Sequence, residues 1–106
     1  MPGLTARSPS GEIVAGPQRL FIEDLDSLPF PAWHLIDTSR YRLPFREEPF
    51  LIVAPLRGCP FNCNFCTCQT YYGKKLRKRS IARVIQEIEY DIQRFGVKSF
   101  ISYSIS

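Results

Sequence analysis

The chain has 106 residues, a net charge of +4, and ordinary apolar and charged fractions of 44% and 23%. These values exclude a disordered chain and leave room for one small domain. The longest apolar run, residues 50–56, is far shorter than the ~20 residues of a membrane-spanning helix, and the first residues lack the apolar core of a signal peptide. We therefore expect a cytoplasmic protein without a membrane span.

Residues 1–49 predict a linker or arm. Residues 1–19 are rich in Pro, Gly and Ser, and only residues 12–15 among them indicate a short strand. Residues 37–49 are polar, basic and interrupted by prolines, which is typical of a connector.

Residues 20–33 predict an extended arm that packs on a larger surface. Their apolar side chains favour such packing, and Pro29 and Pro31 interrupt any long helix. Trp33 is expected to anchor the arm in a core or interface, because Trp buries a large apolar area.

Residues 50–56 form a continuous apolar run with β-branched side chains, which predicts a strand buried on both faces in a parallel sheet. Pro55 should lie at or near the end of this strand, because it cannot donate to the hydrogen bonds of the sheet. The cysteine-containing residues 57–68 follow directly. We therefore expect them at the carboxyl end of the first strand, where α/β folds place their chemistry.

Residues 67–79 predict a polar and aromatic loop, and a helix follows. Ser80 is a candidate N-cap, residues 81–95 have helical apolar spacing, and Gly96 is placed to end the helix. The stripe predicted to pack in the core consists of Ile81, Val84, Ile85, Ile88, Ile92 and Phe95. The opposite face, expected to be exposed to solvent, carries Arg83, Glu87, Asp91 and Arg94.

Residues 97–103 predict a second strand, so that strand, helix and strand make one right-handed βαβ unit. One such unit cannot bury both faces of its sheet, and a barrel needs several units, roughly 200 residues or more. The predicted fold class is α/β, the first βαβ unit of a partial TIM-like (β/α) barrel, preceded by an irregular linker. We expect the chain to be a truncated piece of a larger enzyme.

All four cysteines lie close together, with the spacing C-x3-C-x2-C-x-C. In a reducing compartment, clustered cysteines more often bind metal or do redox chemistry than form disulfides. Thiolates of Cys59, Cys63 and Cys66 can bind three irons of a cubane cluster and leave the fourth iron open to a substrate or cofactor. Arg57 favours the thiolate form. Cys68 is expected to be a spare thiol, because it follows Cys66 too closely for one cubane.

A small zinc-binding module is the alternative. With Cys68 as fourth ligand the cysteines could satisfy tetrahedral zinc, although structural zinc sites usually draw paired ligands from two separate loops. In this alternative the basic run at residues 74–79 binds nucleic acid, with Tyr71 and Tyr72 as stacking candidates. Such a run is more often a solvated face, so we do not expect nucleic acid as a partner.

The segment Cys59-Pro-Phe-Asn-Cys63-Asn-Phe-Cys66 resembles the C-x3-C-x-aromatic-C signature of the radical S-adenosylmethionine (SAM) superfamily. The resemblance implies that the three cysteines hold a [4Fe-4S] cluster whose open iron is chelated by SAM. It also implies that Phe65 lies against the SAM adenine, whereas the residues alone explain Phe65 equally well by packing of the loop. The family's chemistry is reductive cleavage of SAM to a 5′-deoxyadenosyl radical, which abstracts hydrogen from a substrate.

The resemblance extends to the subgroup with a preceding cobalamin-binding domain, which includes methyltransferases and the anaerobic magnesium-protoporphyrin monomethyl ester cyclase. The segments that carry it are residues 11–14, 22–32, 57–63, 72–80, 84–89 and 95–98. It implies that residues 1–49 are a linker from a cobalamin-type domain and that residues 50–106 begin the radical SAM domain. A chain of this kind is expected to be inactive in isolation.

The same resemblance implies the partners of the reaction. These are a small-molecule, lipid or tetrapyrrole-type substrate, and a reductase, flavodoxin or ferredoxin as electron donor. Cobalamin would be bound by a domain outside these residues.

Overall fold

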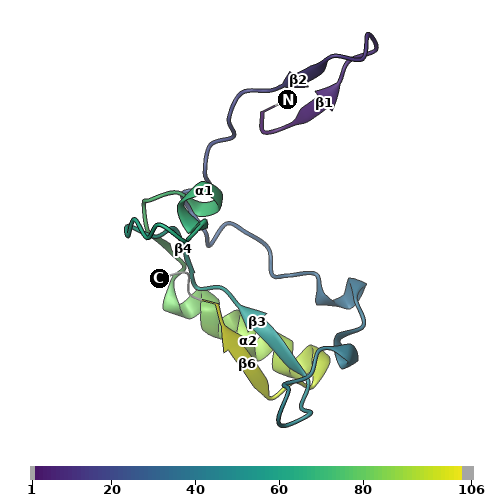
Figure 1. The fold of residues 1–106 in the computed structure, drawn as a ribbon. Helices are drawn as coiled ribbons and strands as arrows, with labels where there is room; N and C mark the ends of the chain where they lie inside the picture. The colour runs from purple at the N-terminus through teal and green to yellow at the C-terminus, as the bar shows by residue number, and fades with distance from the viewer. Residues whose placement is uncertain (1, 104–106) are drawn as a thin grey trace.

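A computed structural model of the chain describes residues 2–103 (Figure 1). These residues form a mixed α/β arrangement with small two-stranded sheets. No helix within residues 2–103 has the length and apolar character needed to cross a membrane. The last residues of the predicted domain 50–106, residues 104–106, lie outside the described part.

The centre of the fold is a strand–helix–strand unit. Strands β3 (Phe50–Val53) and β6 (Ser99–Ser102) pair in parallel, and the helix α2 (Ile81–Phe95) lies between them in the chain (Figure 1). This confirms the predicted order of strand, helix and strand and the α/β class. The barrel to which such a unit could belong stays a prediction.

Both ends of α2 follow the expected local chemistry. The Ser80 hydroxyl oxygen accepts a hydrogen bond from the Arg83 backbone N–H at 3.1 Å, which satisfies one of the free donors at the start of the helix. Gly96 adopts the left-handed conformation with φ 66°, and its N–H donates to the Ile92 carbonyl at 3.0 Å. The predicted bounds of this helix are therefore confirmed.

The predicted strand of residues 50–56 is split at Pro55. After β3 the chain turns into β4 (Leu56–Arg57), which pairs antiparallel with β5 (Arg77–Lys78). The Pro55 carbonyl accepts from the Arg79 N–H at 2.9 Å and so holds the new pairing in place. Proline cannot continue the β3 ladder as a donor, which explains the break.

Two elements lie where the sequence predicts a loop. Within residues 67–79 the structure has the helix α1 (Cys68–Tyr72) and the strand β5. The prediction of an uninterrupted loop is wrong, because Cys68 turns inward to a buried position and Gly73 ends the short helix. Both elements are too short to give a periodic signal.

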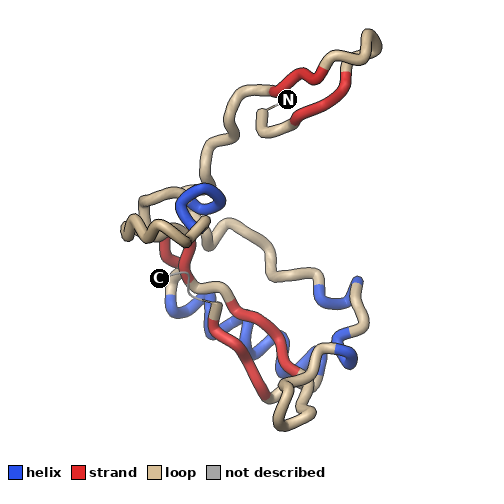
Figure 2. Tube along the Cα trace, viewed as in Figure 1, coloured by secondary structure: helices blue, strands red, loops and turns tan. Residues whose placement is uncertain are grey.

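The N-terminal residues form a hairpin that stands away from the rest of the chain (Figure 2). Strand β1 (Thr5–Arg7) pairs antiparallel with β2 (Ile13–Ala15), and the side chains of both strands are exposed. The short strand expected near residues 12–15 is confirmed, whereas its partner was not predicted. Two single turns of 3₁₀ helix, η1 (Trp33–Leu35) and η2 (Thr38–Arg40), follow later in the chain.

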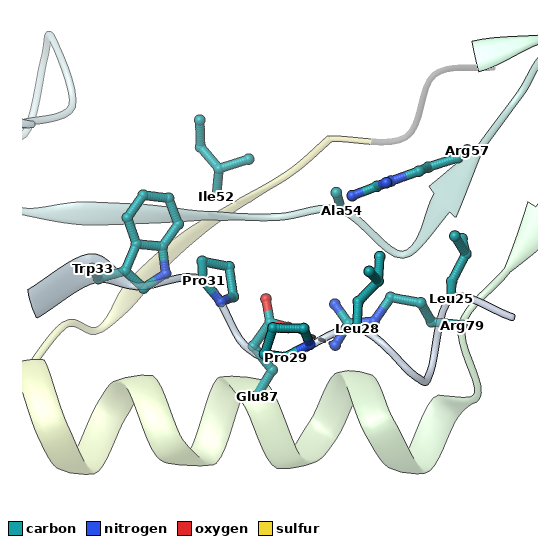
Figure 3. A pocket seen from close by; sticks show the side chains of 10 residues that line it. All are labelled: Leu25, Leu28, Pro29, Pro31, Trp33, Ile52, Ala54, Arg57, Arg79 and Glu87. Carbon is teal, nitrogen blue, oxygen red and sulfur yellow. Dashed lines mark ion pairs between the residues drawn. The ribbon is translucent and has the colours of Figure 1, made fainter. Parts of the chain in front are cut away.

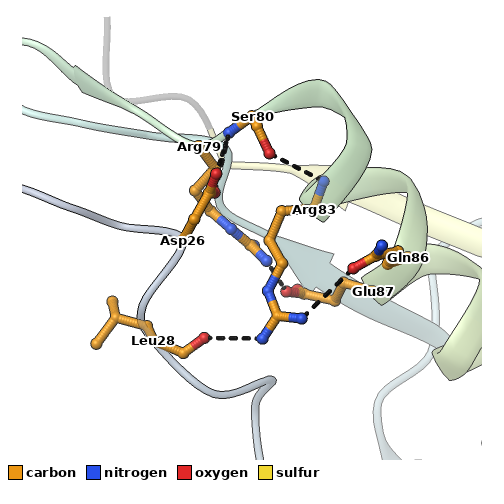
Figure 4. Close-up of polar contacts among 7 residues, drawn as sticks. All are labelled: Asp26, Leu28, Arg79, Ser80, Arg83, Gln86 and Glu87. Atoms are coloured by element: carbon orange, nitrogen blue, oxygen red, sulfur yellow. Dashed lines mark hydrogen bonds and ion pairs between the residues drawn. The ribbon is translucent and has the colours of Figure 1, made fainter.

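The arm of residues 20–33 is extended, as predicted, and lies along α2. The Asp26 carboxylate accepts from the Ser80 N–H at 2.9 Å, and the Arg83 guanidinium donates to the Leu28 carbonyl at 3.2 Å (Figure 4). Arg83 also lies over the ring of Phe30, 4.1 Å from its centroid. The surface on which the arm packs is therefore the polar face of this helix.

The prediction that Glu87 and Asp91 face solvent is wrong. Their relative exposures are 1% and 0%, because the arm covers this face of α2. Glu87 forms an ion pair with Arg79, with 2.5 Å between the guanidinium nitrogen and the carboxylate oxygen. Asp91 lies beside the Trp33 indole without a well-formed hydrogen bond to it.

The apolar stripe of α2 is covered only in part. Val84 and Ile88 are half-buried, whereas Ile81 is 80% exposed and Ile85 and Ile92 are also exposed. The buried apolar core instead includes Leu25, Leu51, Val53 and Val97. The expected burial of the whole stripe is wrong within the described residues, because a sheet of two strands is too narrow to cover it. Burial of the first strand on both faces is wrong for the same reason, since Ile52 is exposed.

Asp91→Asn is expected to stabilise the protein at neutral pH. Burial, together with the nearby charge of Glu87, raises the pKa of Asp91 from 3.8 to about 6, and the Trp33 indole offsets this only in part. The folded state therefore binds a proton more tightly than the unfolded state. The stability that protonation of Asp91 contributes is fully present below about pH 4. It is lost as the pH rises through about 6.

The Asp91→Asn variant has no carboxyl group at this position, so this contribution of pH to its stability is absent. Urea unfolding at pH 7.5 should show a gain of about 1–2 kcal/mol for the variant, and the gain should vanish near pH 4. An equal gain at both pH values would contradict a titrating Asp91 as the cause.

Candidate metal centre

The cysteine loop begins directly after β4. Cys59 is buried at 6% exposure, and its N–H donates to the Gly73 carbonyl at 3.1 Å. Gly58 has φ 100°, and a Cβ there would collide with the carbonyl oxygen of Lys75. Only glycine fits this tight approach of two backbones, so Gly58 places Cys59 against the end of α1.

Cys63 and Cys66 lie on the exposed part of the loop. The Cys66 N–H donates to the Cys63 carbonyl at 3.1 Å, which closes a turn between the two residues. Between them lies Phe65, whose side chain is 91% exposed and therefore has little contact with the rest of the loop. The side chain of Gln69 donates to the Phe61 carbonyl and ties α1 to the loop. The position of Phe65 argues against loop packing as its role.

Cys68 lies on the inner side of the site. It is 7% exposed, its thiol contacts that of Cys59, and its N–H donates to the Cys66 sulfur at 3.4 Å. Burial, and then the neighbouring Cys59 and Cys66 sulfurs, raise the pKa of the Cys68 thiol. The structure thus brings Cys59, Cys66 and Cys68 near one another and leaves Cys63 on the outer turn. Within residues 2–103 no three ligating side chains are gathered closely enough to hold a metal ion.

Comparisons with known proteins identify the chain's relatives. No protein-family model matches it. An uncharacterised methyltransferase of Pyrococcus horikoshii is 35% identical over 84% of the chain and 19% of its own length. The cytidylyl-2-hydroxyethylphosphonate methyltransferase of Streptomyces wedmorensis is 30% identical over 92% of the chain and 21% of its own length. The anaerobic magnesium-protoporphyrin IX monomethyl ester cyclase of Rubrivivax gelatinosus is 33% identical over 93% of the chain and 18% of its own length.

The chain belongs to the radical SAM superfamily. Its relatives, methyltransferases and a cyclase, place it in the subgroup with a preceding cobalamin-binding domain, as the sequence predicts. The chain spans about a fifth of the length of these relatives.

The donor set fits the iron–sulfur cluster that radical SAM chemistry requires. Thiolates are the ligands of such clusters, and Cys63 and Cys66 lie exposed on a turn where an incoming cluster can reach them. Cys59 is already held by its backbone contact to Gly73. Among the described residues the sulfurs of these three cysteines are not gathered around one point.

A hollow lies beside two of the cysteines, Cys66 and Cys68. Its volume is about 420 Å³, and it is lined by Cys66, Thr67, Cys68, Tyr71, Tyr72 and Tyr103. Tyr103 follows β6, and its N–H donates to the Val53 carbonyl at 2.8 Å. The sequence pattern predicts Tyr103 only as the last residue of a strand. The pairing rule for parallel strands could have found it, because their carboxyl ends meet at one edge of the sheet.

A second hollow of about 270 Å³ lies between the arm, β3 and α2 (Figure 3). Its walls are mostly apolar, and Arg57, Arg79 and Glu87 are the charged residues that line it. None of the cysteines lines this hollow. It therefore belongs to the packing of the arm and not to the candidate metal centre of this radical SAM chain.

The basic run of residues 74–79 is not a continuous exposed surface. Arg77 is 6% exposed and donates to the carbonyls of Ile22 and Tyr72, at 2.7 and 2.5 Å. Arg79 is occupied by Glu87. The lysines of the run stay exposed.

Proposed function

We propose that Cys59, Cys63 and Cys66 hold a [4Fe-4S] cluster and that Phe65 contacts SAM. The observation that carries the proposal is the position of the three thiols, in one loop at the carboxyl end of the first parallel strand of a radical SAM chain. Phe65, 91% exposed beside two of these thiols, is free to contact a ligand.

The chain's own residues prepare the site. Gly58 permits the close backbone turn before Cys59. The Cys68 N–H donates to the Cys66 sulfur at 3.4 Å and so orients this side chain. When bound, the cluster supplies one electron for reductive cleavage of SAM to methionine and a 5′-deoxyadenosyl radical. The hollow lined by the tyrosines Tyr71, Tyr72 and Tyr103 provides space for the bound nucleotide.

For the whole protein we propose a cytoplasmic radical SAM enzyme of the methyltransferase or cyclase kind, built on a partial (β/α) barrel. Residues 1–49 then link a cobalamin-binding domain to residues 50–106. The substrate is a small molecule, lipid or tetrapyrrole, and a reductase, flavodoxin or ferredoxin donates the electron. The inward placement of Arg77 and Arg79 supports a role for the basic run in packing, not in binding nucleic acid.

Anaerobic reconstitution with iron and sulfide tests the proposal. We expect a brown protein with a broad thiolate-to-iron absorbance near ~400 nm, and an electron paramagnetic resonance (EPR) signal after reduction that changes when SAM is added, since SAM binds the open iron. A colourless protein that holds one zinc, with Cys68 as the fourth ligand, would instead support the small zinc module.

A further inference from the structure

The arm meets the metal centre through Arg77. This buried guanidinium donates to the Ile22 carbonyl on the arm and to the Tyr72 carbonyl at the end of α1. It also lies 4.8 Å from the centroid of the Phe21 ring. Its backbone pairs with Arg57, two residues before Cys59. One side chain thus joins the arm to both segments that flank the cysteine loop.

A second connection runs from Phe21 through Gly73 to Cys59. The Phe21 ring packs so closely on Gly73 that a Cβ there would lie 2.8 Å from a ring carbon. The Gly73 carbonyl is the acceptor for the Cys59 N–H, at 3.1 Å. The Phe21 ring therefore packs against Gly73, whose carbonyl accepts the hydrogen bond from the buried Cys59.

We propose that Phe21 is a positioning residue for the metal centre: docking of the arm ring on Gly73 and Arg77 fixes the Cys59 backbone in the orientation that receives the cluster. This inference rests on the proposed function, since it assigns Cys59 as a ligand.

Phe21→Ala tests the inference, with Phe30→Ala as a matched control. Phe30 lies on the same arm and, like Phe21, has an arginine over its ring, but this arginine, Arg83, and the neighbouring Tyr90 ring both belong to α2. In the iron-free chain, amide hydrogen exchange by NMR should show about a tenfold loss of protection at Cys59 in Phe21→Ala and none specific to Cys59 in Phe30→Ala. Phe21→Tyr keeps the ring and should retain protection.

The reconstituted protein supplies the second readout. Phe21→Ala should lose its iron to a chelator several-fold faster than Phe30→Ala does and should give an altered EPR spectrum, because the geometry of one ligand is no longer fixed. If Phe21→Ala fails to give a folded circular dichroism spectrum, Phe21→Leu, which removes the ring over Arg77 and shortens the contact to Gly73, takes its place, with smaller losses of the same kind expected.

The outcomes separate the inference from the proposed function. Equal protection at Cys59 in the wild type and Phe21→Ala, or an equal loss in both alanine variants, would overturn the positioning role whatever the iron content. Lost protection with wild-type chelator kinetics and EPR spectrum would overturn the link to the cluster. A wild-type chain that binds no iron refutes the proposed function, and with it the link to the cluster, while hydrogen exchange still decides whether the arm holds Cys59.

Discussion

Alanine substitution of Cys59, Cys63 or Cys66 is expected to remove iron almost completely from the reconstituted protein. Two remaining thiolates would leave two irons of a cubane without protein ligands. Loss of a partner outside the first ligand shell already costs on the order of tenfold in metal affinity, so loss of a ligand should cost more. Iron and sulfide per chain, with the absorbance near ~400 nm, measure the effect.

Cys68→Ala is the matched control. Cys68 is as buried as Cys59 and lies beside it, so a general loss of packing would appear in both variants. We expect Cys68→Ala to keep its iron. If it loses iron as completely as the other variants, the assignment of three ligands is wrong and a four-thiolate site takes its place.

Arg79→Ala is expected to destabilise the fold by about 3–5 kcal/mol, because it leaves the buried Glu87 carboxylate without its cation. The two side chains are only 10% and 2% exposed, so water cannot replace the lost partner. Urea unfolding at pH 7.5, with the midpoint and slope fitted together, measures the loss.

Lys75→Ala provides the comparison for this pair. It breaks a salt bridge to Glu23 whose side chains are 74% and 63% exposed, and exposed pairs contribute little. Arg79→Met combined with Glu87→Leu should recover most of the stability, since apolar residues can replace a buried ion pair. Equal midpoints for Arg79→Ala and Lys75→Ala would refute burial as the source of the effect.

Local chemistry made part of the fold predictable. Ser80 and Gly96 define the ends of α2 through their own backbone preferences, and Pro55 ends β3 because it lacks an N–H. Burial of the charged face of α2 is not predictable from its own pattern, because it depends on an arm some 60 residues earlier in the chain. A periodic pattern shows which residues share a face but not what covers that face.

The candidate site was predictable in composition and not in arrangement. The spacing of Cys59, Cys63 and Cys66 marks them as candidate ligands, and the comparisons support the family that this spacing resembles. The inward turn of Cys68 depends on the α1 helix, which is too short to give a periodic pattern in the sequence. The role of Gly73 depends on Phe21, a contact between distant segments that no local pattern contains.

The parallel pairing of β3 with β6 has a consequence for biosynthesis. Phe50 of β3 pairs with Ser99 of β6. Strand β3 can therefore pair only after nearly all of the described chain has emerged from the ribosome. Closing so long a loop is slow relative to helix formation. During that delay Cys59 and Cys68, which the folded chain buries, are exposed to oxidants. We therefore expect insertion of the proposed cluster to follow closure of the sheet.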